Sequence, residues 1–554
     1  MRHAGVRAPR LFSIATALLL ASAAHAACLL GGTVLDAETS RPLARVRVFA
    51  ERPAQPPAPR PAAILRVTDA SGAFCFDSLE PAVYTLLAQR GNYLLTRYGA
   101  RPGRTEGTVS FTVNGRDALP PVTIRMVAAA GISGTVLDDH GQPVDGVMVD
   151  LQRKIYDIVW EPSHEVATHT DSAGAFHFAN LPPGSYYLKI EPGHMPQPDE
   201  PLYEGPLLDE KGRPLAPPGA ITYYSGSYAF AHATPVVVKA GQSVDNLLVA
   251  MKPPLPRRIS GRVSVAADPK VLAEAEVVAT PLIDIGGPGG QLHSASIQPD
   301  GSFAIADLRP VEYEVTVDGL PSHFSAKADL SNGDLDGLIL QPLRTNTIHV
   351  AARQDGVDGP ATAALAICDT ERECGPPVQP DVRGAYTFSG LRPSLYRFRS
   401  RTAGLFVKSV AVNGKALGDA PLDLRQAAPE SIAMVFGDKL SAVEGNLPAR
   451  DAATPGLGVS ILLVNEIRFT PEVSNTFVAA GQDGRFHFDS VMPGRYRVLA
   501  IEGFDDGPWG SPELFNLLRE KSVAVEVGEG QTKSVTAPVV SMGEWEAALR
   551  KLGM

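Results

Sequence analysis

The sequence predicts an all-β protein built from five repeated units, and three observations lead to this prediction. The 554 residues include 52 glycines and 48 prolines, which supply many turns and discourage long helices. One strand–turn–strand motif occurs five times along the chain. Successive copies lie 83 to 127 residues apart, which is about the length of one β-sandwich.

The recurring motif reads G-x-[FY]-x4-[LV]-x-P-x-x-Y. Its glycine permits the positive φ of a tight turn, and the alternating apolar residues after it are typical of a half-buried strand. The Pro-containing turn then leads into a second strand, which the tyrosine opens. Each copy therefore predicts two antiparallel strands. The aromatic position of the motif holds Phe74, Phe176, Phe303, Tyr386 and Phe486.

A second shared element lies upstream of the motif. The segments 32–34, 134–136 and 261–263 each read G-x-V, with the valine 40 residues before the aromatic residue. The last two copies keep this element only loosely, in 349–351 and 444–447. An alternating strand follows it in the first two copies, so each repeat begins with a strand well before its motif.

These elements together resemble the carboxypeptidase regulatory-like domain. Residues 32–34, 42–48, 68–79 and 84 carry the resemblance in the first repeat, and 134–136, 143–149, 170–181 and 183–186 carry it in the second. It weakens in the third repeat, where Gln298 replaces the leading Asp, and in the fourth, which lacks G-x-V. The resemblance implies a tandem array of five transthyretin-like, Ig-like Greek-key β-sandwich modules of seven strands in an exported bacterial protein. It implies no reaction.

The repeats set the expected domain boundaries. We expect short helices over 512–520, with Ser511 as N-cap, and over 541–552. The Pro-rich segment 252–256 is typical of a stiff linker. The predicted division is a signal peptide (1–26), repeat 1 (27–127), repeat 2 with a Pro-rich and Tyr-rich insertion (128–252), repeat 3 (257–343), repeat 4 (344–437), repeat 5 (438–540) and a C-terminal helix (541–554).

The N-terminus has the pattern of a secretory signal peptide. Three arginines precede an apolar run over 11–20, and Ala24 to Ala26 form an A-x-A cleavage site. No later segment reaches the roughly 18 apolar residues of a membrane span, so no transmembrane segment is expected in the mature chain. Lipidation of Cys28 stays an alternative, although His25 stands where a lipobox needs an aliphatic residue.

The four cysteines predict two disulfides, because an even number in an exported protein favours pairing. Three pairings are open, and Cys28–Cys75 with Cys368–Cys374 is favoured because each pair then lies within one repeat. No paired C-x-x-C or suitably spaced histidine indicates zinc, so neither a metal site nor a cofactor is predicted.

Composition and motifs also limit the function. A net charge of −10 argues against a nucleic-acid partner. No nucleophile–base or phosphate-binding motif is present, and the sequence predicts no catalytic residue. The segment 164–169, HEVATH, has one residue too many for a zincin motif and has strand character. Aspartates beside the turn glycines could be calcium ligands, but we interpret them as turn formers: Asp69, Asp171, Asp300 and Asp483.

Loop aromatics are the best candidates for ligand binding: Tyr223, Tyr224, Tyr228 and Trp509. A structural role is their alternative. The sequence therefore predicts an elongated, non-enzymatic scaffold or adhesion-type protein of the bacterial envelope, periplasmic or attached to the cell surface. Its expected partner is an envelope protein or a polysaccharide. The alternative is a carbohydrate-binding envelope protein that uses exposed loop aromatics.

Overall fold

Strands dominate the computed structural model of this protein, and its helices are short. Among the described residues, no helix is long and apolar enough to cross a membrane. The helices are α1 (Pro269–Ala273), α2 (Pro512–Leu518), α3 (Met542–Lys551) and the 3-10 turns η1 (Phe230–His232) and η3 (Arg519–Lys521). The described residues are 28–53, 61–99, 109–156, 160–192, 219–264, 269–283, 292–370, 374–448, 458–466, 476–481, 483–503 and 511–552.

The first sheet of every repeat has the same central arrangement. The strand of the G-x-V element lies in the middle, antiparallel to the strand of the aromatic motif and parallel to a late strand. The three strands, in spatial order, are β4 (Ala73–Phe76), β1 (Leu30–Asp36) and β8 (Val122–Met126) in repeat 1; β12 (Ala175–Leu181), β9 (Ala130–Leu137) and β16 (Ser243–Ala250) in repeat 2; β20 (Ser302–Leu308), β17 (Arg257–Val263) and β23 (Leu335–Leu340) in repeat 3; β26 (Ala385–Leu391), β24 (Asn346–Gln354) and β31 (Ile432–Gly437) in repeat 4; β35 (Arg485–Val491), β32 (Ser441–Asn446) and β38 (Thr532–Thr536) in repeat 5.

The second sheet faces the first, and it varies more. In repeat 4 two strands, β28 (Phe406–Val412) and β29 (Lys415–Ala416), extend the first sheet instead. The second sheets contain β3 (Ile64–Val67), β2 (Arg47–Glu51), β5 (Ala82–Gln89), β6 (Thr96–Arg97) and β7 (Ser110–Val113) in repeat 1; β11 (Trp160–His169), β10 (Met148–Tyr156), β13 (Gly184–Glu191), β14 (Thr222–Tyr223) and β15 (Val236–Val238) in repeat 2; β19 (His293–Ser296), β18 (Glu276–Pro281), β21 (Glu312–Asp318) and β22 (Ser325–Asp329) in repeat 3; β25 (Leu365–Asp369), β27 (Leu395–Ser400) and β30 (Leu422–Asp423) in repeat 4; β34 (Thr476–Ala479), β33 (Val459–Asn465), β36 (Gly494–Glu502), β37 (Val523–Val527) and β39 (Val539–Val540) in repeat 5.

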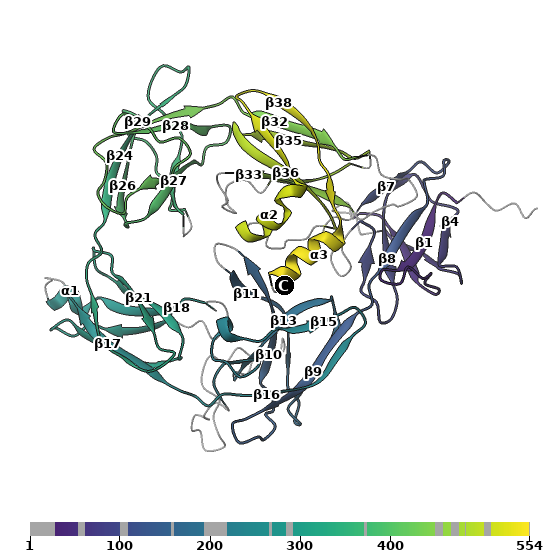
Figure 1. Ribbon diagram of the computed structural model, residues 1–554, viewed down its shortest axis with the longest axis horizontal. Coiled ribbons are helices and arrows are strands. Elements are labelled where there is room, and N and C mark those ends of the chain that lie inside the picture. The colour runs from purple at the N-terminus through teal and green to yellow at the C-terminus, as the bar shows by residue number, and fades with distance from the viewer. Residues whose placement is uncertain are drawn as a thin grey trace, which may run out of the picture.

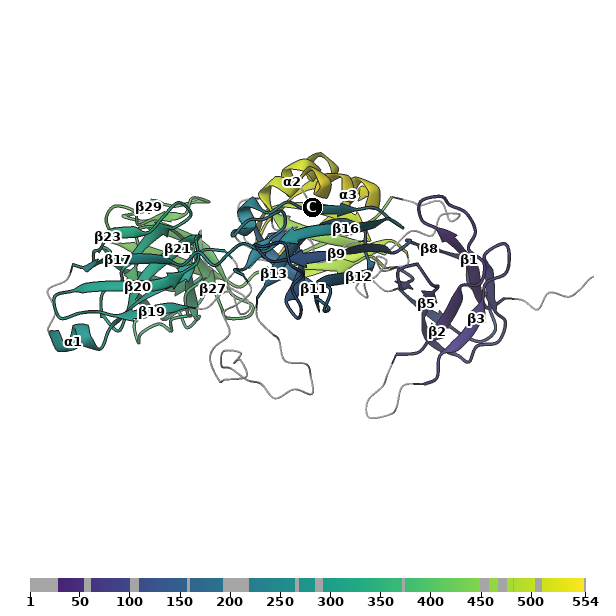
Figure 2. The ribbon, with the colours of Figure 1, turned by 90° about the horizontal axis from the view of Figure 1, so that it is seen from below.

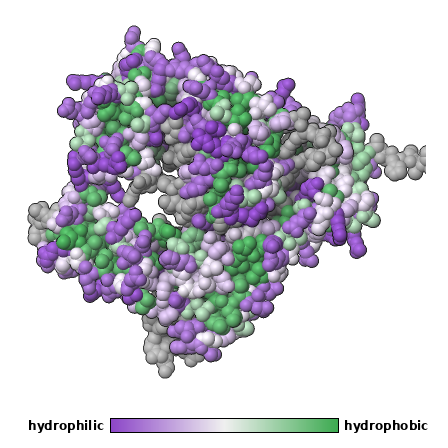
Figure 3. Space-filling view, in the orientation of Figure 1, coloured by the Kyte–Doolittle hydropathy of each residue, from purple (hydrophilic) through white to green (hydrophobic). Residues whose placement is uncertain are grey.

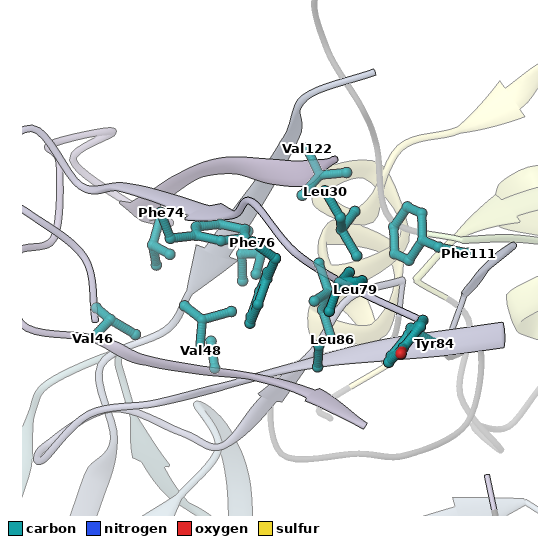
Figure 4. Close-up of a cluster of buried hydrophobic side chains, with 14 of the residues drawn as sticks. Leu30, Val46, Val48, Phe74, Phe76, Leu79, Tyr84, Leu86, Phe111 and Val122 are labelled. Atoms are coloured by element: carbon teal, nitrogen blue, oxygen red, sulfur yellow. The ribbon is translucent and has the colours of Figure 1, made fainter. Parts of the chain in front are cut away.

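Each pair of sheets encloses a hydrophobic core of its own. In repeat 1, Phe74 and Phe76 of β4 point across the interior at Val46 and Val48, as Figure 4 shows. Separate clusters of buried residues occupy the corresponding interiors of the other four repeats. Because removal of apolar side chains from water drives the packing of the two sheets, the repeated motif places its aromatic residues there. The all-β class predicted from the sequence is confirmed.

The chain curves back on itself. Figures 1 and 2 show repeats 2 to 5 arranged around a centre in a flat assembly, with repeat 1 outside this ring and beside repeat 5. The amide of Gly458 donates to the carbonyl oxygen of Gly99 at 2.9 Å and joins these two repeats. The expectation of an elongated array is therefore wrong for the arrangement seen here, because the chain curves from repeat 2 to repeat 5 and brings repeat 5 back to repeat 1.

The expected helices are confirmed at the C-terminal end. Ser511 caps α2, and Ser541 and Glu544 form a capping box at the start of α3. Helix α2 ends at Leu518, two residues earlier than expected, and continues as η3. Both helices cover the outer face of the second sheet of repeat 5, where Trp545, Leu514 and Leu518 are buried. Helix α1 was not expected from the sequence.

Candidate functional site

The turn aspartates accept hydrogen bonds from the backbone amides of their own turns. Asp69 Oδ1 accepts the amides of Ser71 at 2.8 Å and Ala73 at 2.9 Å, and Asp171 makes the same pair of bonds to its turn. The hydrogen bond from the Ser71 hydroxyl is the main cause that lowers the pKa of Asp69 below its usual value. The interpretation of these residues as turn formers is confirmed. Repeat 4 uses Asp381 in the same way, which the sequence reading did not name.

The motif tyrosines close the turn that precedes them. Four hydroxyls donate to the carbonyl oxygen four residues upstream, and that of Tyr313 accepts the Arg309 amide instead. This is the arrangement of a tyrosine corner, which ties a turn to the strand after it. The four donors are Tyr84 at 3.1 Å, Tyr186 at 2.7 Å, Tyr396 at 3.0 Å and Tyr496 at 2.8 Å.

The segment 164–169 lies within β11, as its strand character predicted. His164 Nδ1 lies 2.6 Å from Asp150 Oδ1, and the His164 side chain is 63 % exposed while that of Asp150 is 8 % exposed. A buried carboxylate thus orients an imidazole whose other edge faces solvent. Among the described residues no group of three or more histidine, cysteine or acidic side chains is gathered as a metal site would need.

Asp150 belongs to a buried polar cluster on the outer face of β10 and β13. Its Oδ2 accepts the Gln152 side-chain amide at 2.7 Å. On β13, Lys189 Nζ pairs with Glu191 Oε1 at 2.6 Å, with both side chains at most 5 % exposed. Sequence reasoning missed this cluster. The available signal was the polar alternation of Asp150 with Gln152 and of Lys189 with Glu191 between apolar residues, because alternate strand residues share one face.

Tyr223 is buried completely, so it is not the exposed loop aromatic that the sequence analysis expected. It lies on β14 and packs with Tyr187 and Phe230 in a small aromatic cluster. Tyr224 is half-buried, and its backbone amide donates to the Leu188 carbonyl at 3.0 Å. Strand pairing of β14 with β13 draws the segment onto the sheet, which a reading of loop composition does not foresee.

Tyr228 holds the linker between repeats 2 and 3. Its hydroxyl donates to the carbonyl oxygen of Pro253 at 2.9 Å, and Lys252 Nζ lies 5.4 Å from its ring centre. Burial raises the pKa of Tyr228 above its usual value, so the hydroxyl keeps its proton for this bond. Ile283 of repeat 3 packs against the aromatic cluster of repeat 2. The Tyr-rich segment therefore forms a joint between two repeats.

The other joints also consist of specific contacts. Between repeats 1 and 2, the Ala129 amide donates to Asn92 O at 2.9 Å, and Tyr93 forms a β-bridge with Ala128. Arg392 of repeat 4 lies 3.4 Å from Glu314 of repeat 3. Lys408 bridges Asp355 of repeat 4, at 2.6 Å, and Glu529 of repeat 5, at 2.7 Å.

Both favoured disulfides are present. Cys28 pairs with Cys75 at the end of the first sheet of repeat 1, and Cys368 pairs with Cys374 in repeat 4. Trp509 and the signal-peptide segment 1–26 lie outside the described residues. The structure thus brings Tyr223, Tyr224 and Tyr228 together at one joint.

Several solved structures are similar to this chain. The streptococcal ancillary pilin is similar at 12 % identity and TM-score 0.19, over 51 % of this chain and 99 % of that one. The Bacillus anthracis TIE protein is similar at 12 % identity and TM-score 0.15, over 74 % of this chain and 73 % of that one. The major pilin subunit of Bacillus cereus is similar at 10 % identity and TM-score 0.13, over 74 % of this chain and 99 % of that one. No curated protein matches the chain.

The family comparison concerns repeat 2. Residues 131–200 match the model of the carboxypeptidase regulatory-like domain. This segment contains β9 to β13, with the motif aromatic Phe176, the corner tyrosine Tyr186 and the buried polar cluster. Repeat 2 is therefore similar to a carboxypeptidase regulatory-like domain over residues 131–200, within an all-β array of repeats that share its central three-stranded arrangement.

Proposed function

We propose that this protein is an exported, non-enzymatic scaffold or adhesion-type protein of the bacterial envelope. In it, the five repeats are β-sandwich modules with the boundaries 27–127, 128–252, 257–343, 344–437 and 438–540. Its role is to hold the surfaces of these modules at defined positions for an envelope protein or polysaccharide. Several weak contacts presented together then sum through their effective concentration.

One observation carries the proposal: the joints between repeats consist of directed contacts. A flexible tether would leave neighbouring domains to move independently. Here Tyr228 bonds the linker at Pro253, and Lys408 pairs with carboxylates of two repeats. A chain whose domains are fixed in this way is suited to presenting surfaces at constant spacing.

The chemistry of the side chains supports a passive role and an oxidising compartment. The recurrent aspartates and tyrosines are engaged by the backbone of their own turns. Both disulfides are of the kind that persists outside the reducing cytosol. The burial of Tyr223 removes one member of the proposed sugar platform, so we do not put forward the carbohydrate-binding alternative as a second function.

Small-angle X-ray scattering of residues 27–554 tests the proposal. A rigid scaffold predicts one curve that matches the curved arrangement of Figure 1, and the variant Lys408→Glu should expand the particle by breaking the joint of repeats 4 and 5. Arg116→Glu, at an exposed arginine away from the joints, is the control with the same charge change. A curve that requires independently moving domains in the wild type would refute the proposal.

The partner class needs a second experiment. The mature protein is immobilised and exposed to the envelope fraction of its host, and the retained proteins and polysaccharides are identified separately. Retention of a defined set of either supports the scaffold. Chemical conversion of a retained component would instead show an enzyme.

A further inference from the structure

The second sheets of repeats 1 and 5 carry the same apolar row on their outer faces. In repeat 5, Leu462 lies opposite Leu499 on one side and Phe477 on the other. In repeat 1, Phe49 lies opposite Leu87 and Leu65 in the same register. Since inward residues alternate with outward ones along a strand, both rows face away from the core of their repeat.

The chain covers only one of these two rows with its own helices. Leu462 and Leu499 lie beneath α2 and α3 and are each 4 % exposed, whereas Phe477 at the end of this row is 51 % exposed. In repeat 1, Leu65 is 43 % exposed, Val67 beside it is 55 % exposed, and Phe49 and Leu87 are half-buried. We name the surface of Phe49, Leu65, Val67 and Leu87 the repeat 1 face. An apolar surface of this kind, left in water, indicates a contact site.

Charge distinguishes repeat 1, which carries this face, from the next two repeats. Residues 27–127 contain 12 arginines, no lysine and eight acidic residues, whereas 128–343 contain 27 acidic and 13 basic residues. Arg47, opposite Val67, is exposed and makes no ion pair with a described residue. The repeat 1 face, with Arg47 beside its apolar residues, therefore belongs to a basic repeat in a chain whose next two repeats are acidic. Charge complementarity of this kind favours association of repeat 1 with an acidic surface.

Repeat 2 offers a surface of complementary character. On the outer face of its first sheet, Leu248 is 65 % exposed and lies opposite Thr135. Asp245 of the same strand β16 is exposed, bonded to the Ser133 hydroxyl and without an ion pair to a described residue. Figure 3 shows an apolar area where β9, β15 and β16 lie. We name the surface of Leu248 and Asp245 the repeat 2 face.

We propose that the repeat 1 face of one copy of this protein docks on the repeat 2 face of a second copy. Phe49 and Leu65 would cover Leu248, and Arg47 would pair with Asp245. The two faces are different surfaces, so the contact is heterologous and each copy keeps one face open for the next. The proposal goes beyond the scaffold function and does not depend on it.

Two variants of the mature chain, residues 27–554, test the contact by complementation. One carries Leu65→Ser with Arg47→Glu and has only an intact repeat 2 face. The other carries Leu248→Ser with Asp245→Lys and has only an intact repeat 1 face. Sedimentation velocity at low salt is run on the wild type, on each variant and on their equimolar mixture. Circular dichroism checks that each variant is folded.

The proposal expects concentration-dependent oligomers of the wild type that dissociate as salt rises to about 0.5 M, because the charge pair is exposed. Each variant alone should associate at least about tenfold more weakly. Their mixture should form a 1:1 dimer that grows no further. Arg116→Glu with Ile339→Ser is the matched control, at exposed positions outside both faces, and should behave as the wild type.

Three results would overturn the proposal. The first is a wild type that stays monomeric at all concentrations. The second is a mixture in which no dimer forms although both variants are folded. The third is a control that loses association like the two variants. A monomeric wild type could instead bind an unrelated envelope protein. If the Leu65→Ser, Arg47→Glu variant is then not retained on that protein, the repeat 1 face is assigned to that partner. The rigidity measured by scattering is unaffected by any of these outcomes.

Discussion

Phe303 lies directly opposite Gly261 across the antiparallel strands β20 and β17, and its ring occupies the space above the glycine. A Cβ atom at Gly261 would stand 2.9 Å from Phe303 Cζ and would overlap the Leu338 carbonyl of β23. The same pairing joins Phe176 to Gly134 and Phe486 to Gly445. The G-x-V element and the aromatic motif, distant in sequence, are thus two halves of one packing arrangement.

Substitution of this glycine should therefore destabilise a repeat without touching its surface. We expect Gly261→Ala to lower the free energy of unfolding of repeat 3 by about 1–3 kcal/mol, because the strand and the ring must separate. Urea denaturation followed by circular dichroism measures the loss. Gly333→Ala, in the same repeat and with open space at its Cβ position, should change stability by less than about 0.5 kcal/mol. Equal losses in both variants would contradict the packing argument.

The joint of repeats 2 and 3 should loosen when Tyr228 loses its hydroxyl. Tyr228→Phe removes the 2.9 Å bond to Pro253 O, worth about 1 kcal/mol, and should speed amide exchange across 219–258 about fivefold. Hydrogen–deuterium exchange with peptide resolution measures this. Tyr224→Phe is the control in the same segment, because its hydroxyl makes no bond to a described residue. Unchanged exchange in Tyr228→Phe would show that the bond does not hold the linker.

The joint of repeats 4 and 5 should depend on pH. The hydrogen bond from Lys408 lowers the pKa of Asp355, so this residue's contribution is complete above its ordinary value of 3.8 and is lost as pH falls further. Asp355 and Glu529 raise the pKa of Lys408, so its contribution is complete below 10.5 and is lost at higher pH. Scattering should show the compact arrangement between these limits and expansion beyond them. Lys408→Met should be expanded at all pH values.

The C-terminal helix should separate from repeat 5 in acid. Hydrogen bonds from Lys521 and then Ser541 lower the pKa of Glu544 from 4.5 to about 2. Its stabilisation is therefore complete above 4.5 and is lost as pH falls through about 2. Glu544→Gln should cost the cap about 1 kcal/mol at neutral pH, since the residue is partly exposed. Fluorescence of buried Trp545 reports this, in a chain with Phe at the other two tryptophans. Acid-independent fluorescence would contradict the role of Glu544.

The two disulfides should differ in their effect on stability. In the chain-entropy model, the sequence separation of 47 between Cys28 and Cys75 gives about 4 kcal/mol, and the separation of 6 between Cys368 and Cys374 gives about 2 kcal/mol. Cys75→Ala should therefore lower the denaturant midpoint of repeat 1 more than Cys374→Ala lowers that of repeat 4. Calorimetry or urea titration with both variants distinguishes this order from its reverse.

Repeat 4 lacks the glycine of the G-x-V element and packs its aromatic residues differently. It has Val350 in place of the glycine opposite the motif aromatic Tyr386. The Tyr386 hydroxyl donates to Ala363 O, and burial raises the pKa of Tyr386 to about 12. An aromatic ring lies over a glycine elsewhere in the same sheet, where Phe406 is opposite Gly437. The packing of Phe406 over Gly437 therefore compensates for the missing G-x-V glycine, and the sequence alone does not reveal this.

The sequence singled out three tyrosines as contact residues but did not predict their surroundings. Tyr223, Tyr224 and Tyr228 were chosen as loop aromatics, and the structure brings them to one joint. Composition indicates that such residues are suited to making contacts. It does not indicate whether they face solvent or pack against another repeat. The buried polar cluster around Asp150 and Lys189 was missed because its burial depends on what covers the outer face of β10 and β13.

The sequence by itself determined the properties that rest on local periodicity. Alternation, turn residues and recurrence predicted the all-β class, the strands of each motif, the caps at Ser511 and Ser541 and the pairing of the cysteines within repeats. These properties follow from backbone preferences and neighbouring residues. Only the tertiary structure decided the curvature of the array, the burial of Tyr223 and the exposure of Leu65. Each of these depends on contacts between segments far apart in the chain, for which the local pattern carries no signal.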